Sequence, residues 1–301
     1  MANITATTAD AFIPEIWANS ALEVLRNNVV LAGLVTKDTD VAAFSVGDVL
    51  HVPYPGTFSV NDKAAGSNVT TQTPTGADTT VTLNKHKEVS FVVEDFARAV
   101  ANQDILARYV EAATVALAEQ IETDLMTLVT SATNSVGAAV TDITASAVRS
   151  ARKKLHDQKA PNAGRVLVVS PKDEIALLGD SNLATYFANA QAGAVQNGQI
   201  GRLYGFDIYT SQLVQSTGSA GTLTYHNPAF APGAIMLAMR GLPEAPAGSG
   251  AVSSSIRDPQ SGLVIRSTVS YNASALGAQV TLDCLYGVKR LREEKLVDVK
   301  S

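Results

Sequence analysis

The feature that most constrains the fold is a long polar stretch between two segments with strand character. Residues 44–54 carry Val, Leu and Phe and end among prolines. Residues 81–93 are apolar at alternate positions at both ends, with two lysines between, which is the period of a strand. Residues 56–80 between them are polar, and their large apolar side chains are Phe58, Val60 and Val69. We predict a long hairpin held from outside the subunit, because an isolated hairpin is only marginally stable in water.

The strongest helical pattern follows the hairpin. Residues 104–130 place an apolar side chain every three or four positions, which predicts one helix about 40 Å long at 1.5 Å per residue. The side chains expected on the opposite, solvent-facing side are Arg108, Glu111, Glu119 and Glu122.

After Gly137 the pattern changes to short helices alternating with strands. Helical spacing over 143–155, an apolar run at 165–170 and a proline-started helix at 173–178 predict an α/β unit with its own core. Further strands are expected at 200–211 and 234–239, and the Pro- and Gly-rich stretch 243–255 reads as a linker.

Three strands are expected near the C-terminus, at 262–271, 279–288 and 295–299. The long helix and the hairpin have no sheet nearby in the sequence, so we expect these strands to return and cover them, giving a discontinuous domain. At the other end, residues 12–34 suggest a short helix or extended arm. Its tryptophan, Trp17, has few local partners and is expected to dock on its own or a neighbouring subunit.

Composition limits the function. Apolar residues make up 46% and charged residues 17%, as in folded proteins, and the net charge of -5 with pI near 5.4 argues against tight, sequence-specific DNA binding. The N-terminus lacks the features of a secretory signal, and no apolar run is long enough to span a bilayer. We therefore expect a protein that is made and kept in the cytoplasm and makes no membrane contact.

The sequence offers little for catalysis. The four histidines have no His or Cys at ligand spacing, no Gly-x-Ser-x-Gly motif occurs, and the single Cys284 lies in an apolar run that predicts a buried thiol. Basic clusters occur at 149–154 and 289–295. We interpret them as a solvated helix face and a salt-bridge edge, with a phosphate-binding stripe as the alternative. We expect no catalytic residue, no metal and no cofactor.

The order of these elements resembles the Hong Kong 97-type capsid fold. Residues 165–178 (RVLVVSPKDEIALL) and 201–211 (GRLYGFDIYTS) are similar to the core of that family's axial domain, and 285–288 (LYGV) also fits. The resemblance implies an α+β fold with an N-terminal arm at 1–40 and an extended β-hairpin loop at 41–93. It further implies a discontinuous peripheral domain with a long spine helix, at 94–136 and 256–301, and an inserted α/β axial domain at 137–255.

The resemblance also implies a function. It suggests the major capsid protein of a tailed bacteriophage, which assembles as hexamers and pentamers into an icosahedral shell around double-stranded DNA, in the host cytoplasm. Expected partners are further copies of the chain, scaffolding, portal and decoration proteins, and the packaged DNA through non-specific contact. The side chains we expect at assembly contacts are Trp17, Phe58, Val89, Phe91, Arg108 and Glu122.

Two alternatives remain open at this point. An encapsulin-like nanocompartment resembles the same fold but packages an enzyme, and an interior peptide-binding groove would mark it. A two-domain α/β hydrolase is the more distant alternative, because the sequence shows no nucleophile, metal or phosphate motif to support it.

Overall fold

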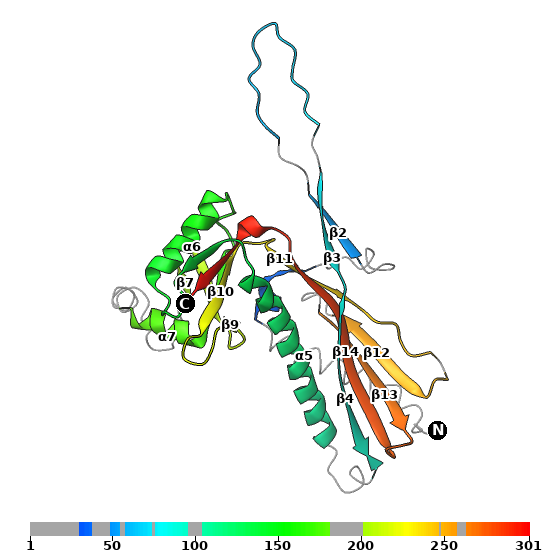
Figure 1. Cartoon of the computed structure of the whole chain (residues 1–301). Coiled ribbons are helices and arrows are strands. Elements are labelled where there is room, and N and C mark those ends of the chain that lie inside the picture. The colour runs from blue at the N-terminus through cyan, green and yellow to red at the C-terminus, as the bar shows by residue number, and fades with distance from the viewer. Residues whose placement is uncertain are drawn as a thin grey trace.

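The computed structural model describes residues 30–37, 49–54, 58–73, 76–95, 104–180, 201–246, 248–257 and 263–301, with no side-chain detail at 77 and 104–108. These residues form a mixed α+β structure with two sheets, a long helix and a projecting hairpin (Figure 1). The expected strand residues 44–48 and the expected arm up to residue 29, including Trp17, lie outside the described residues.

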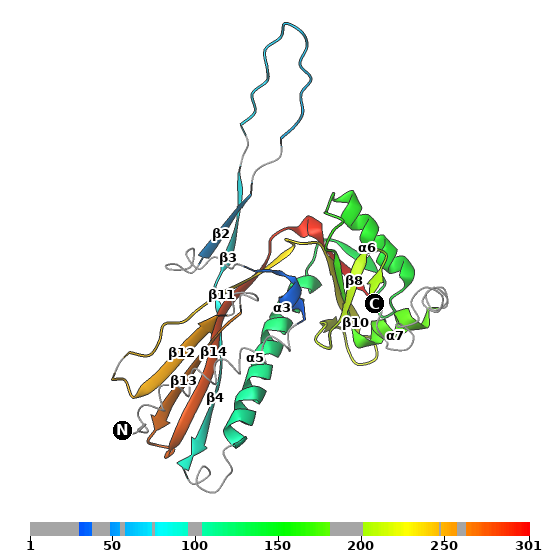
Figure 2. The ribbon, with the colours of Figure 1, turned by 180° about the vertical axis from the view of Figure 1, so that it is seen from behind.

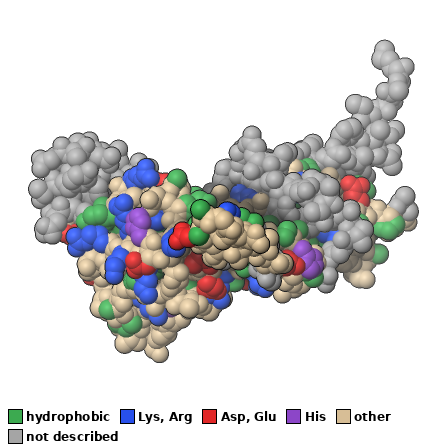
Figure 3. Space-filling view, turned by 90° about the horizontal axis from the view of Figure 1, so that it is seen from above, with side chains coloured by type: hydrophobic (Ala, Val, Ile, Leu, Met, Phe, Trp, Pro, Cys, Tyr) green, Lys and Arg blue, Asp and Glu red, His purple; other side chains and the backbone are tan. Residues whose placement is uncertain are grey.

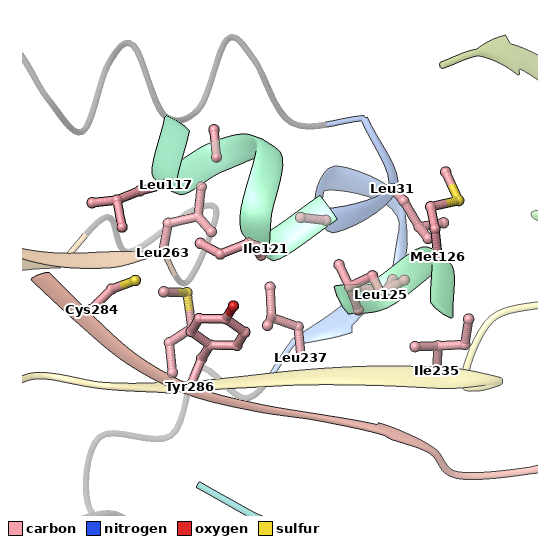
Figure 4. Packing of buried hydrophobic residues seen from close by; sticks show 14 of the residues in the cluster. Leu31, Leu117, Ile121, Leu125, Met126, Ile235, Leu237, Leu263, Cys284 and Tyr286 are labelled. Carbon is pink, nitrogen blue, oxygen red and sulfur yellow. The ribbon is translucent and has the colours of Figure 1, made fainter. Parts of the chain in front are cut away.

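The long helix α5 (Asp104–Thr130) has the bounds that the sequence predicts. Its apolar face buries Leu117, Ile121 and Leu125 against the larger sheet, together with Leu31 of the short helix α3 (Leu31–Leu34) (Figure 4). A polar contact fixes the same interface: the Tyr286 hydroxyl donates to the Asp124 carboxylate on α5 at 2.7 Å. The helix therefore packs by its apolar face and is oriented by a hydrogen bond.

The larger sheet has six strands built around the 14-residue β14. One edge of β14 pairs with β11 along one half of its length and with β13 along the other half. Strand β1 lies outside β11, and β12 lies outside β13. The other edge of β14 pairs with β4. Alternate β14 side chains enter the α5 core, because successive residues of a strand point to opposite faces. The strands are β1 (Thr36–Lys37), β4 (Lys85–Glu94), β11 (Ile235–Arg240), β12 (Ala251–Arg257), β13 (Val264–Asn272) and β14 (Gly277–Arg290).

The second sheet has seven strands in the order β5-β15-β10-β6-β8-β7, with β9 beside β10. Helices α6 (Ala145–Asp157) and α7 (Pro171–Gly179) pack on one face, and Phe230 and Val168 on the other face join the α5 core. Strand β6 is buried on both sides, which explains its unbroken apolar sequence. The strands are β5 (Ser135–Gly137), β6 (Val166–Val169), β7 (Arg202–Leu203), β8 (Phe206–Thr210), β9 (Ser216–Thr217), β10 (Thr224–Phe230) and β15 (Leu296–Lys300).

The predicted strand at 81–93 is divided in the structure. Strand β3 (Ala77–Thr82) pairs with β2 (Val49–Tyr54) to make the hairpin, whereas β4 pairs along ten residues with β14. Leu83 and Asn84 separate the two strands. The prediction that 81–93 as a whole pairs with 44–54 was wrong, since alternation identifies a strand but not its partner.

Two further strand assignments need correction. Strand β11, expected in the α/β unit, belongs to the six-stranded sheet, and β15, expected beside the long helix's sheet, pairs with β10 and β5 in the other one. Strand β10 was not predicted. The sequence assigned β11 and β15 to the wrong sheets because their partner strands lie far away in the sequence, and local patterning carries no information about distant partners.

Candidate assembly surfaces

The hairpin projects well beyond the rest of the subunit (Figures 1 and 2). Strands β2 and β3 form six residue pairs, and residues 58–73 continue past them without regular structure. In this outer part Phe58, Val60 and Val69 are 65%, 99% and 68% exposed. Large apolar side chains left in water at the end of a projection are typical of a surface that a partner covers.

A side-chain clamp joins the two limbs of the outer hairpin. The Gln72 carboxamide accepts the backbone N–H of Ser59 at 3.0 Å and donates to the Ser59 carbonyl oxygen at 2.5 Å. This is the pairing that a strand residue would make, so it keeps the limbs together where the ladder has ended.

The base of the hairpin is anchored in the subunit. Val81 and Leu83 are buried against Met236 and Ala238 of β11, and Leu50 of β2 packs on the same small cluster. The Arg292 guanidinium lies over the Tyr54 ring at 5.2 Å from its centroid. The base is therefore fixed to the larger sheet, while the outer part makes no such cluster among the described residues.

Strands β4 and β12 of the larger sheet each present an unpaired edge within the described part of the chain. Strand β4 pairs only with β14, and β12 pairs only with β13, so the outer backbone N–H and C=O groups of both have no strand beside them there. Such edges can accept a strand from another chain.

Four of the predicted assembly residues lie in three different places in the structure. Phe58 lies on the exposed hairpin tip. Val89 and Phe91 of β4 are half-buried against the subunit's own α5 core, and the Phe91 ring lies 5.9 Å from that of Tyr109 on α5. Arg108 lies in α5, but its side chain is outside the described part. The intersubunit contacts of these residues stay predictions.

Glu122 was expected on the exposed side of α5, and this was wrong. Its side chain is buried, with 1% of the residue exposed, and its carboxylate accepts the backbone N–H groups of Leu31 at 2.5 Å and Ala32 at 3.1 Å. Burial raises the pKa of Glu122, and the N–H donors partly oppose this rise. Helical spacing did not reveal this position, because the first turn of α3 covers it from a distant part of the sequence.

The buried ionisable groups serve structure. His226 of β10 lies 2.7 Å from the Asp298 carboxylate of β15 and 2.9 Å from the Thr217 hydroxyl of β9, which ties three strands together. Burial raises the pKa of Asp298, opposed by the contact with His226. Cys284 is a buried free thiol, as predicted, and burial raises its pKa to about 12. Among the described residues no cluster of three or more His, Cys, Asp or Glu could hold a metal ion.

Solved structures of similar fold come from phage particles. A chain of Mycobacterium phage Che8 is 23% identical with a TM-score of 0.67, and the match covers 90% of each chain. The head structure of Helicobacter pylori bacteriophage KHP40 gives 10% identity, a TM-score of 0.65 and coverage of 89% and 88%. The capsid of cyanophage P-SCSP1u gives 14%, 0.64, and coverage of 90% and 87%. No curated protein sequence matches the chain.

The fold therefore defines the class: this is the mixed α+β fold of phage capsid subunits. The phage capsid protein family matches residues 76–279, so the chain belongs to that family and is a structural protein, not an enzyme. The predicted relationship to phage capsid proteins is confirmed, and as a capsid protein the chain is a component of the virion. None of the helices within the described ranges is long and apolar enough to cross a membrane.

Proposed function

We propose that the chain assembles as hexamers and pentamers into an icosahedral shell that encloses double-stranded DNA. The projecting hairpin is the observation that carries this proposal. Its tip exposes Phe58, Val60 and Val69 at a distance from the subunit's own core, so burying them requires another chain. In a closed symmetric shell every copy can bury the same surface against a neighbour, and many modest contacts together stabilise the shell.

In this proposal the parts of the subunit take the roles of the Hong Kong 97-type fold. The hairpin, within 41–93, is the extended loop and α5 is the spine helix. The six-stranded sheet forms the peripheral domain, and the seven-stranded sheet with α6 and α7 forms the axial domain. Relative to the sequence-based boundaries, β11 and β12 move to the peripheral domain and β15 to the axial domain.

The open edges of β4 and β12 suggest where neighbouring copies, or the residues 1–40 of an N-terminal arm, add to the sheet. Scaffolding, portal and decoration proteins are proposed as further partners, with assembly in the host cytoplasm. These partners follow from membership of the capsid family, which supports self-association more directly.

Assembly of hairpin variants tests the proposal. We would replace Phe58, Val60 and Val69 together with Ser, and compare this variant with Asn61→Ser, Asn68→Ser and Thr70→Ser combined, which alters the same loop without removing apolar surface. Negative-stain microscopy, with a scaffolding protein co-expressed if needed, should show closed shells for wild type and the control. The apolar-to-Ser variant should remain as folded unassembled subunits. Normal shells from that variant would show that the hairpin tip does not hold the shell together.

A further inference from the structure

Helix α6 carries a continuous basic stripe along its outer face. Arg149, Arg152, Lys153 and His156 occupy positions i, i+3, i+4 and i+7, and all four residues are exposed. The inner face of the helix is apolar and buried, through Ala145, Val148, Ala151 and Leu155. Positions three and four apart are neighbours on a helix, so the stripe is a row about 10 Å long that holds three cationic side chains and ends at His156, whose Nε2 accepts a hydrogen bond from Arg152 Nε at 3.3 Å.

The turn between β7 and β8 positions the two arginines. Tyr204 and Gly205 both have positive φ, 47° and 83°, which is the geometry of a two-residue hairpin turn. The Arg149 guanidinium lies 5.7 Å from the centroid of the Tyr204 ring, and Arg152 Nη1 donates to the Tyr204 carbonyl oxygen at 3.0 Å. Side chains already held in this way lose less conformational entropy when they bind a ligand.

The positive charge of the stripe is poorly neutralised within the subunit. Arg149 and Arg152 have no carboxylate partner among the described residues, and Lys153 pairs with Asp157 only at 3.9 Å, between exposed side chains. Residues 149–159 contain five Lys or Arg and one Asp, a formal charge of +4 in a chain of net charge -5, so the other residues sum to -9. Figure 3 shows Lys and Arg side chains gathered on the side of the molecule where α6 lies in Figure 1.

We propose that the α6 stripe binds the phosphate backbone of double-stranded DNA without reading its sequence. This inference rests on the proposed shell function, in which that DNA is the enclosed material. Guanidinium groups match phosphate geometry, and a row of about 10 Å spans about three phosphates of one strand at ~3.4 Å each. The negative charge of the remaining residues repels DNA, which concentrates the contact on this face.

A second copy of the chain fits this surface less well than DNA does. Some acidic side chains of the described structure are ion-paired inside the subunit: Asp124 with Lys85, Asp142 with Lys172, Asp283 with Arg266 and Glu293 with Arg290. A neighbouring subunit still exposes single carboxylates such as those of Glu88, Glu111 and Glu119, whereas DNA offers a phosphate at every nucleotide, which matches a continuous row of cations.

Salt-dependent DNA binding by unassembled subunits tests the inference independently of shell formation. Fluorescence anisotropy with a short duplex of mixed sequence would compare wild type, Arg149→Gln with Lys153→Gln, and a control, Lys63→Gln with Lys289→Gln, that removes the same charge from other exposed positions. We expect the stripe variant to weaken binding about tenfold and to lower the slope of log K against log salt by about 2, since each phosphate contact contributes about 0.9. The control should change the slope by much less.

Equal losses in both double variants, or no loss in the stripe variant, would overturn the assignment to α6. Sedimentation of the same proteins without DNA tests whether a neighbouring subunit binds the stripe instead. If the stripe variant lost self-association but kept wild-type DNA binding, the surface would be a contact between subunits and the proposal would be wrong. If wild type formed shells in the microscope but the stripe variant kept the wild-type salt slope, the DNA contact at α6 would be rejected and the proposed shell function would stand. Absence of shells would instead count against the proposed function.

Discussion

Gly287 in β14 lies directly against the carbonyl oxygen of Thr82 in β3, at the base of the hairpin. A Cβ atom at position 287 would stand 2.2 Å from that oxygen, which is closer than any real Cβ contact. This approach of two backbones lets the hairpin leave the larger sheet with its base packed on the cluster of Val81 and Leu83. The attachment of the hairpin therefore depends on the absence of a side chain in β14.

Replacing Gly287 with Ala should displace the hairpin base. The atoms that the added methyl group would meet belong to the backbone of Thr82 and Leu83, so no rotamer change can relieve the clash, and overpacking of this kind costs about 1–3 kcal/mol. Urea unfolding of the unassembled subunit would measure the loss. Gly179→Ala is the matched control, since a Cβ there meets nothing within 4 Å. Equal stability of the two variants would show that the close approach is unimportant.

Glu122→Gln should destabilise the contact between α5 and α3. The carboxylate accepts two backbone N–H groups, and an amide has only one oxygen, so one buried N–H is left facing an NH2 group. We expect a loss of about 1–3 kcal/mol in the free energy of unfolding. Glu119→Gln, an exposed change on the same helix, should stay within about 0.5 kcal/mol of wild type. A similar effect of both would argue that Glu122 does not hold α3.

The stability difference between wild type and Glu122→Gln should depend on pH. The pKa of Glu122 in the folded protein is raised above 4.5 by burial, so folding favours the protonated form. The pH-dependent part of the Glu122 contribution is therefore fully present below pH 4.5 and is lost as the pH rises through the raised pKa, which leaves the part that comes from the two N–H groups. Urea unfolding of both proteins at several pH values would show the wild-type advantage shrinking with increasing pH and then levelling. A wild-type advantage that grew with pH would mean that the N–H donors lower the pKa of Glu122 by more than burial raises it.

Cys284 should be inert in the folded subunit. Burial, reinforced by the neighbouring charge of Asp283, raises the pKa of the thiol to about 12, so almost no thiolate exists near neutral pH. We expect an aromatic disulfide reagent to react at least about 100-fold more slowly with native protein than with urea-unfolded protein. The chain has a single cysteine, so the absorbance change reports this side chain alone. Rapid reaction of the native subunit would show that the α5 core opens at β14.

Local patterns predicted the elements that depend on nearby residues. The bounds of α5 follow from helical periodicity, and α7 follows from Pro171 behind Ser170, whose hydroxyl accepts the backbone N–H of Asp173 at 3.2 Å. The exposure of Phe58 follows from a segment with few apolar residues around it. The sequence did not predict that Tyr204 positions the arginines of the basic stripe, because Tyr204 lies in a turn 52 residues after Arg152.

The amino-acid sequence by itself determined the helices α5, α6 and α7, the strand periodicity, the polar hairpin tip and the buried Cys284, because each depends on spacing or composition over a few residues. Only the tertiary structure decided that β3 and β4 have different partners, that β11 and β15 exchange between sheets, and that Glu122 faces inward. Backbone hydrogen bonds between strands are chemically alike at every position, so pairing is selected by which faces can be buried together in three dimensions.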